Sequence, residues 1–207
     1  MLYKLLVSIE RFAALVAVIL LLPWFAIVAV AIVMLSGRGP FVAHRRLGRF
    51  GVRFWMLKFR TMWEPAGRGP ARAAGRAFIE KLPDPVVPEV KAGIDPRVTS
   101  RFAGFCRKHS IDELPQLWHV VRGEMSLVGP RPVTAPEWER HYGASSSEVL
   151  NLKPGLSGLW QTRGRNRLTY RQRRRLDLFL ARHYCLLLYL RILGQTVPRV
   201  IAGRDAW

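Results

Sequence analysis

Cysteines and acidic residues are both scarce in this chain. Its 207 residues include two cysteines, Cys106 and Cys185, and 14 acidic residues against 33 lysines and arginines. Two isolated cysteines are too few for a disulfide framework or a thiolate metal site, and they suit a reducing compartment. The shortage of acids leaves a formal net charge of +19, which requires an anionic partner: nucleic acid, anionic lipid or a phosphorylated substrate.

Charge is absent altogether between Phe12 and Leu35. A helix over this run, at about 1.5 Å per residue, is long enough to cross a hydrocarbon core of roughly 30 Å. We therefore predict that this segment attaches the chain to a lipid bilayer.

The topology of the apolar segment depends on Pro23, which lies in its middle. A proline removes one helical hydrogen bond and bends the axis, and positive charge stays on the cytoplasmic side of a membrane. Basic residues flank both ends of the run: Lys4, Arg11, Arg38, Arg45 and Arg46. A helix that enters, bends at Pro23 and returns to the same face satisfies both ends, so residues 1–38 are predicted to form a re-entrant membrane helix. The alternatives are an ordinary kinked span and a cleaved signal peptide, which the continuation of the run past Ala31 disfavours.

Residues 39–207 are predicted to form a small cytosolic catalytic domain of mixed α/β class, mostly helical. Glycines punctuate residues 39–51, which predicts a turn or a short β-hairpin. Residues 54–62 predict a short strand with Lys58 and Arg60 on one side. Residues 64–93 are rich in Gly, Pro, Ala and Arg, which predicts a variable surface excursion with at most a turn of helix over 71–82.

Two adjacent carboxylates, Asp112 and Glu113, are the most distinctive feature of this cationic chain. Pro115 fits only the first turn of a helix, so a short amphipathic helix is predicted to begin near Asp112. Its apolar face is expected to consist of Leu114, Leu117, Trp118 and Val121, with core contacts just before it from Phe102, Phe105 and Cys106. Asp112 can be merely a helix cap with Glu113 as a solvated neighbour. The alternative is chemistry on phosphates, which the surrounding positive charge favours.

Several ordered motifs, spread over nearly the whole chain to about Thr196, resemble those of the bacterial sugar transferases. The motifs are Lys58–Met62, Asp95–Thr99, Ser110–Leu117, Gly123–Pro132 and Lys153–Gln161. Members of this family are monotopic phosphoglycosyl transferases, which move a sugar phosphate from a nucleotide sugar to a polyprenyl phosphate. The resemblance implies the minimal catalytic form of the family, with amphipathic interfacial helices, on the cytoplasmic face of the bacterial inner membrane.

The resemblance also implies a particular chemistry. Asp112 would be the nucleophile and Glu113 its acidic partner, in two steps through a covalent phosphosugar on the aspartate. The donor would be a UDP-sugar and the acceptor undecaprenyl phosphate, with UMP released and Mg²⁺ bound at Asp112. General chemistry agrees, because phosphoryl transfer needs an in-line nucleophile and positive charge on the phosphate oxygens, and because Mg²⁺ prefers carboxylate and phosphate oxygens.

Four cations are candidates for binding the substrate phosphates: Lys58, Arg60, Arg107 and Arg131. Pro130 and Pro132 restrict the backbone on both sides of Arg131. This would present its guanidinium to a phosphate or a uridine at little ordering cost. The alternative is a rigid turn with a solvent-facing arginine.

Two later positions match the family as well. Arg165 corresponds to a residue expected near the nucleotide, and Asp177 to an acidic position of the downstream helix. The other arginines between Arg163 and Arg175 are expected to contact anionic headgroups or solvent. Residues 183–193 predict a helix lying in the membrane interface, with Tyr184, Tyr189 and Arg191 at headgroup depth, or else a buried core helix.

Four residues depart from the family pattern: Leu22, His119, Glu124 and Trp160. Leu22 precedes Pro23 where relatives often carry a small hydroxyl residue, which weakens the case for the re-entrant bend. The other three are expected to reshape the sugar pocket. None of them removes a group that the chemistry needs.

A function of another class remains open at this stage, namely a membrane-tethered basic protein that binds nucleic acid or anionic lipid without catalysis. It would explain the charge but not the pair of acids, and the chain has no RRM, KH or zinc-finger pattern, so no nucleic-acid partner is expected. A hydrolase at the same site is a nearer alternative. The adjoining apolar helix argues against it, because that helix suits a membrane-soluble acceptor.

Overall fold

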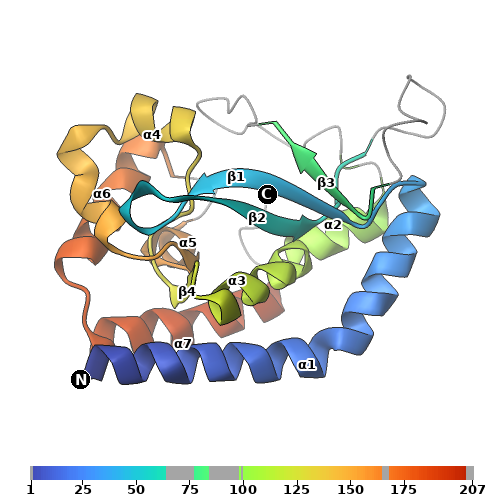
Figure 1. Cartoon of the computed structure of the whole chain (residues 1–207), viewed down its shortest axis with the longest axis horizontal. Coiled ribbons are helices and arrows are strands. Elements are labelled where there is room, and N and C mark those ends of the chain that lie inside the picture. Colours follow the sequence, from blue (N-terminus) through green and yellow to red (C-terminus); the bar gives the residue numbers. More distant parts are fainter. Residues whose placement is uncertain (1, 64–76, 84–97, 99, 165–167, 204–207) are drawn as a thin grey trace.

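The computed structural model describes residues 2–63, 77–83, 98, 100–164 and 168–203. The fold is mostly helical with two small sheets, which confirms the predicted α/β class (Figure 1). Most of the excursion predicted over 64–93, most of the motif Asp95–Thr99, and Arg165 lie outside the described residues.

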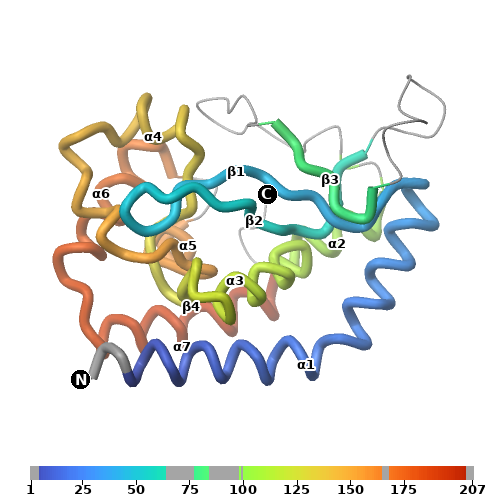
Figure 2. The backbone as a smooth tube through the Cα atoms, viewed as in Figure 1, coloured from blue at the N-terminus to red at the C-terminus, as the bar shows by residue number. Residues whose placement is uncertain are grey.

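Helix α1 runs from Leu2 to Ser36 and is bent (Figures 1 and 2). Pro23 lies inside it, and the missing N–H together with the clash of the proline ring explains the bend. Within Leu5–Ser36 an 18-residue window reaches a mean hydropathy of 3.0, and the span is long and apolar enough to cross a membrane. Figure 1 shows the first arm beneath the domain and the second arm rising along one end of it.

Both arms of α1 pack against the same domain. Ala14 of the first arm lies in an apolar cluster with Leu117 and Val120 of α3 (Leu117–Arg122). Val28 and Ile32 of the second arm pack against Phe59 at the end of β2 (Arg53–Phe59). The domain therefore holds the helix on both sides of Pro23.

The predicted hairpin is present. Strand β1 (Phe41–Leu47) pairs antiparallel with β2, and the turn between them contains η1 (Arg49–Gly51). Strand β3 (Ile79–Leu82) pairs parallel with the other edge of β1. The turn of helix predicted over 71–82 is therefore wrong for these four residues, because pairing with β1 satisfies their backbone groups. A local pattern does not reveal such a long-range pairing.

The segment that carries the two acids consists of α2 (Arg101–Lys108), η2 (Ile111–Gln116) and α3. The start of a helix near Asp112 is confirmed, but its first part is a 3₁₀ helix that contains Pro115. Because a 3₁₀ helix turns 120° per residue rather than 100°, the buried face of α3 is shifted. Val120 is fully buried, whereas Trp118 is 45% exposed, so its place in the predicted apolar face is wrong.

Phe105 was also expected in the core, but it is 54% exposed and packs on the ring of His109. Cys106 is fully buried and Phe102 packs beside Phe59, as predicted. Phe105 is exposed because α2 turns only one face toward the core, the face that carries Ala103 and Cys106.

The rest of the domain surrounds a second sheet of β4 (Ser126–Val128) and β5 (Gly155–Ser157), which pair in parallel. Its helical elements are α4 (Ala135–His141), η3 (Ala144–Asn151), α5 (Leu159–Arg163), α6 (Tyr170–Arg182) and α7 (Leu186–Ala202). Figure 1 shows α4 and α6 at the end of the hairpin away from the second arm of α1.

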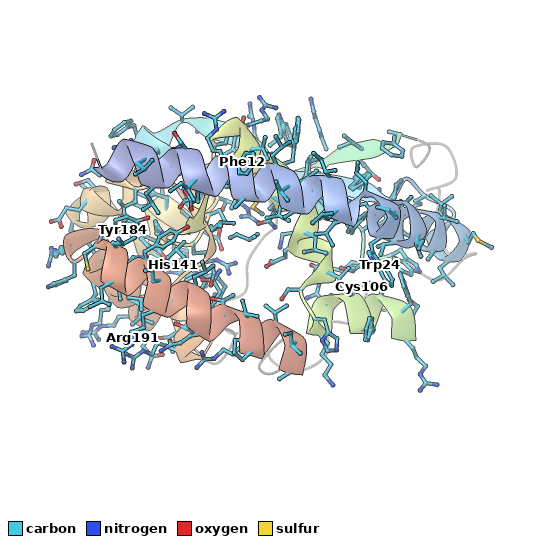
Figure 3. All side chains as sticks on the ribbon, turned by 90° about the horizontal axis from the view of Figure 1, so that it is seen from below. Phe12, Trp24, Cys106, His141, Tyr184 and Arg191 are labelled. Atoms are coloured by element: carbon cyan, nitrogen blue, oxygen red, sulfur yellow. The ribbon has the colours of Figure 1, made fainter. Side chains whose placement is uncertain are left out.

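Residues 183–193 were predicted to form either an interfacial helix or a buried core helix. Helix α7 has features of both, with one buried face and one exposed apolar face. Tyr189 is buried, so its predicted place at headgroup depth is wrong, whereas Leu187 is 78% exposed. The buried face contacts the first arm of α1 through Leu6, and Figure 3 shows both helices on the underside of the molecule. The other face presents exposed leucines, as an interfacial helix does.

Candidate active site

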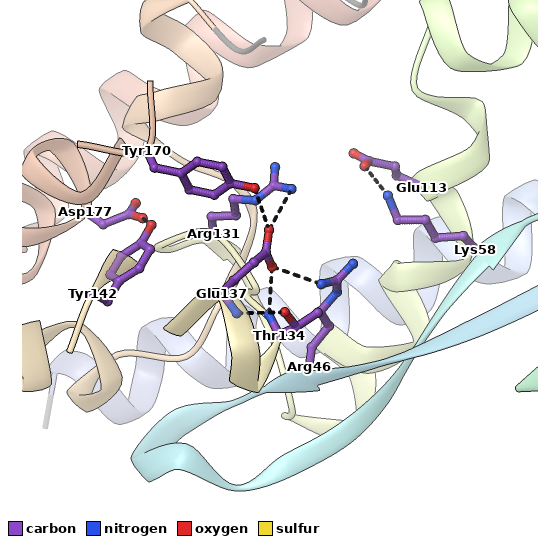
Figure 4. Close-up of polar contacts among 9 residues, drawn as sticks. All are labelled: Arg46, Lys58, Glu113, Arg131, Thr134, Glu137, Tyr142, Tyr170 and Asp177. Carbon is purple, nitrogen blue, oxygen red and sulfur yellow. Dashed lines mark hydrogen bonds and ion pairs between the residues drawn. The ribbon is translucent and has the colours of Figure 1, made fainter. Parts of the chain in front are cut away.

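The two adjacent acids lie on η2, against strand β2. Ser110 has a left-handed backbone with φ of 56°, which turns the chain out of α2 into η2. Asp112 is buried, and Glu113 accepts a hydrogen bond from Lys58 Nζ at 2.7 Å (Figure 4). The fold therefore brings the acids together with one of the two cations predicted on the strand.

Asp112 is more basic than an ordinary aspartate. Burial raises its pKa to about 6; the charges of Lys58 and Arg107 oppose this rise, and Glu113 adds to it. The carboxyl is still mainly ionised at neutral pH. An ionised carboxylate of raised basicity in a partly dry site is suited to attack an electrophile.

Arg60, the second cation predicted on the strand, is bound to Gly39 and Glu80. Its Nε donates to the carbonyl oxygen of Gly39 at 2.8 Å and its Nη2 to Glu80 Oε2 at 2.7 Å. The strand ends at Phe59, so the alternation that would have set Arg60 beside Lys58 stops there. Arg107, in contrast, lies close enough to Asp112 to lower its pKa.

Arg131 lies in the proline-flanked loop after β4, beside a buried acid. Its Nη2 is 4.0 Å from Glu137 Oε1, and Arg46 of β1 is 3.2 Å from Glu137 Oε2 (Figure 4). Although burial opposes ionisation, the two arginines hold the pKa of Glu137 below its usual range. Glu137 is therefore ionised at neutral pH and links Arg131 to the hairpin.

Two further contacts fix Glu137. It forms a capping box at the start of α4, accepting from the backbone N–H of Thr134 at 2.8 Å while the Thr134 hydroxyl accepts from the Glu137 N–H. The Tyr170 hydroxyl of α6 donates to Glu137 Oε1 at 3.1 Å. The site thus joins the hairpin, the loop of Arg131, α4 and α6.

Asp177 lies on α6 and is fully buried. The Tyr142 hydroxyl donates to its Oδ2 at 2.7 Å (Figure 4). Burial raises the pKa of Asp177 to about 7, against the hydrogen bond from Tyr142 and the charges of Arg131 and Arg173. Its surroundings make Asp177 an internal partner of the arginines, rather than an exposed ligand.

Two of the sequence motifs meet at the parallel β4–β5 pair. Gly129 donates its N–H to Ser157 O, and Gly155 donates to Pro130 O, both at 2.9 Å. A Cβ on Gly129 would meet the carbonyl oxygen of Lys153, and a Cβ on Gly155 would meet the backbone of Gly129. Glycine is therefore required at both positions, directly after β4 and at the start of β5, and the close approach fixes the position at which the loop of Arg131 begins.

Two of the departures from the family pattern form one pair. His119 Nε2 accepts the backbone N–H of Leu57 at 3.0 Å, and its Nδ1 lies 2.6 Å from Glu124 Oε2. His119 is 2% exposed, and burial lowers its pKa. This pair braces β2 directly before Lys58, and its expected effect on the shape of the sugar pocket stays a prediction.

A divalent cation at Asp112 requires oxygen ligands. The described residues contain no group of three or more His, Cys, Asp or Glu side chains able to hold a metal. Mg²⁺ differs from most protein-bound metals in this respect, because it keeps several waters and takes one or two carboxylates together with substrate phosphates. Asp112 and Glu113 fit that requirement.

Two buried acids with several hydrogen bonds were missed from the sequence. Glu10 of α1 is 5% exposed and accepts from Ser126 Oγ, the Leu127 N–H and Tyr189 Oη, at 2.6, 2.6 and 2.8 Å. Nothing in its local pattern reveals these partners. Glu137 is different, because Thr134-Ala-Pro-Glu137 is a readable capping box.

The chain is similar to known proteins over most of its length. A family model described as bacterial sugar transferase matches residues 3–203. The chain is 38% identical to the exopolysaccharide production protein ExoY of Sinorhizobium fredii, over 97% of this chain and 87% of that protein. It is 40% identical to a UDP-galactose-lipid carrier transferase of Erwinia amylovora, over 96% of this chain and 40% of that protein. It is 39% identical to an undecaprenyl-phosphate galactose phosphotransferase of Salmonella typhimurium, over 81% of this chain and 34% of that protein.

Proposed function

The chain belongs to the bacterial sugar transferases, and from this premise we propose that it moves a sugar 1-phosphate from a UDP-sugar to a polyprenyl phosphate such as undecaprenyl phosphate. It is a phosphoglycosyl transferase, and the products would be a polyprenyl-diphosphate-sugar and UMP. Such a reaction is the first membrane step in building an exopolysaccharide or another glycoconjugate. The name of the ExoY relative supports a role of this kind.

The observation that carries the proposal is the buried carboxylate of Asp112 beside the Glu113–Lys58 pair. In the first step an oxygen of Asp112 bonds to the β-phosphorus of the donor, the bond from that phosphorus to the bridging oxygen breaks, and UMP leaves. In the second step a phosphate oxygen of the polyprenyl phosphate attacks the same phosphorus and the aspartate is released. Phosphorus changes partners twice, and no oxidant or water is consumed.

The neighbouring cations have separate tasks. Lys58 holds Glu113 and lowers the pKa of Asp112, so that the nucleophile stays ionised. Arg107 acts on Asp112 in the same direction and can reach the phosphate oxygens. Mg²⁺, held by Asp112 with Glu113 near it, would offset the charge of the donor diphosphate.

The two packed arms of α1 support a re-entrant attachment to the cytoplasmic face of the bacterial inner membrane. A straight span would carry residues on either side of Pro23 to opposite faces of the bilayer. Here Ala14 and Ile32 both pack against one domain. These contacts support a topology in which the domain and both ends of the helix lie on the same side, where the basic residues that flank the run are stable.

The test is UMP release by the full chain in nanodiscs, with Mg²⁺, a panel of UDP-sugars and undecaprenyl phosphate. Asp112→Asn keeps the size of the side chain and removes the nucleophile, so release should fall at least a thousandfold. Glu139→Gln, an exposed acid of α4, is the matched control and should keep full activity. No lipid-dependent UMP release from any donor by the folded protein would overturn the proposal.

A further inference from the structure

Two guanidinium groups contact the ring of Trp160. Arg131 Cζ lies 4.7 Å and Arg173 Cζ 5.5 Å from its centroid. The ring is buried at the start of α5, and Arg173 also lies over Tyr170 at 5.3 Å. Two positively charged guanidinium groups therefore lie against one indole ring.

Two acids among the described residues lie near these arginines. Glu137 is 4.0 Å from Arg131 but is shared with Arg46 at 3.2 Å. Asp177, whose pKa burial raises to about 7, is only partly ionised at neutral pH. Burial and the repulsion from Arg131 both lower the pKa of Arg173. Among the described residues Arg131 forms an ion pair with Glu137, which it shares with Arg46, so an anionic ligand at Arg131 would be stabilised by its charge.

The two arginines differ in what they can touch. The side chain of Arg131 is 22% exposed and lies in the proline-restricted loop, so a ligand can reach it. Arg173 is 7% exposed, so it acts on a ligand through its charge and through its contact with the ring. A π face attracts each guanidinium and counteracts their mutual repulsion, whereas an aliphatic side chain of similar volume does not.

We propose that Trp160 is a positioning residue for the nucleotide donor, which holds Arg131 and Arg173 together so that Arg131 contacts the donor diphosphate. The identity of the donor rests on the proposed function. The role of Trp160 rests on its contacts with the two arginines. Trp160, which departs from the family pattern, then changes how the diphosphate is bound and does not change the sugar pocket.

The test compares the binding of UDP and of uridine to the full chain in nanodiscs, by calorimetry. Trp160→Leu should weaken UDP binding about five- to tenfold and leave uridine binding unchanged, because uridine carries no phosphate. Trp160→Phe keeps an aromatic ring with a weaker π face and disturbs the fold less than Trp160→Leu. It should weaken UDP binding about two- to threefold. In steady state the KM for the UDP-sugar should rise in parallel, with kcat within about twofold and the KM for undecaprenyl phosphate unchanged.

A matched control is Trp138→Leu, which removes a ring that packs on Tyr142 at 5.2 Å and has no cation contact among the described residues. It should leave UDP binding unchanged. Arg173→Gln should weaken UDP binding, and adding Trp160→Leu to it should weaken binding less than Trp160→Leu does alone.

Three results would contradict the inference. Equal losses for UDP and uridine, a fall in kcat without a rise in donor KM, or additive effects of the two substitutions would show that Trp160 only fills space. Failure of the unaltered protein to bind any uridine nucleotide would instead overturn the proposed function, so the two failures are distinguishable.

Discussion

At the scale of single residues, the position of Asp112 sets its protonation. Burial raises the pKa to about 6, and Lys58 is the largest opposing charge. A nucleophilic carboxylate must be ionised, so the rate of UMP release should rise with pH through an apparent pKa near 6.

Lys58→Met should move this acid limb to higher pH, because it removes a charge that lowers the pKa of Asp112. The measurement is the pH dependence of kcat/KM for UMP release. Arg53→Met, an exposed cation of the same strand, is the matched control and should leave the limb in place. If the acid limb does not move in the Lys58 variant, Lys58 has no influence on the ionisation of Asp112.

The raised pKa of Asp112 also predicts that ionisation of this carboxyl lowers the free energy of unfolding. A carboxyl whose pKa is raised in the folded state favours the protonated form, so the free energy of unfolding falls as pH rises from about 3.8 to about 6 and stays lower above. Asp112→Asn should therefore stabilise the protein at pH 8 by on the order of 2 kcal/mol, with no gain at pH 3.5. Thermal unfolding at the two pH values measures this, and an equal shift at both would show that another effect dominates.

The residues of the site differ in how far they could be predicted from the sequence. Asp112 and Glu113 could be predicted because two acids in a cationic chain are unusual, and Lys58 because strand alternation faces it toward one side. Their roles in catalysis stay predictions. Glu10 could not be predicted, because its partners Ser126 and Tyr189 are over a hundred residues away in the chain.

At the scale of elements, the β4–β5 pair depends on glycine. A Cβ on Gly155 would meet the backbone of Gly129, so Gly155→Ala must separate the strands and displace the loop of Arg131. We expect a loss of stability on the order of 3 kcal/mol, with donor KM rising, measured by thermal unfolding and UMP release.

Gly194→Ala is the matched control for this substitution. Gly194 lies within α7, and a Cβ there meets nothing within 4 Å. Alanine should stabilise the helix by about 0.5–1 kcal/mol. Equal stability of both variants would contradict the close approach of the two strands.

Element prediction succeeded where the pattern was local and failed where distant pairing decided the structure. The hairpin of β1 and β2 follows from glycine and alternation, and α1 from its uncharged run. Strand β3 and the shifted face of α3 could not be predicted, because the first needs β1 as a partner and the second depends on the 3₁₀ geometry before it. Trp118 is the residue that this shift exposes.

At the scale of the whole molecule, the bent α1 should place both its ends on one side of the membrane. Single cysteines at Lys4 and Arg38, introduced in a Cys185→Ser background because Cys185 is exposed, would report this. A membrane-impermeant maleimide should label both in inverted vesicles and neither in spheroplasts. One label on each side would show an ordinary span, and Cys106, which is buried, should stay unlabelled in both.

The covalent route requires that Asp112 carries the sugar phosphate between donor and acceptor. The most direct measurement is mass spectrometry of the full chain incubated with the UDP-sugar that supports turnover, Mg²⁺ and no acceptor. We expect one added sugar phosphate on the peptide that contains Asp112, its loss when undecaprenyl phosphate is added, and none in Asp112→Asn. UMP release that always requires both substrates, with no adduct at any time, would contradict the covalent route.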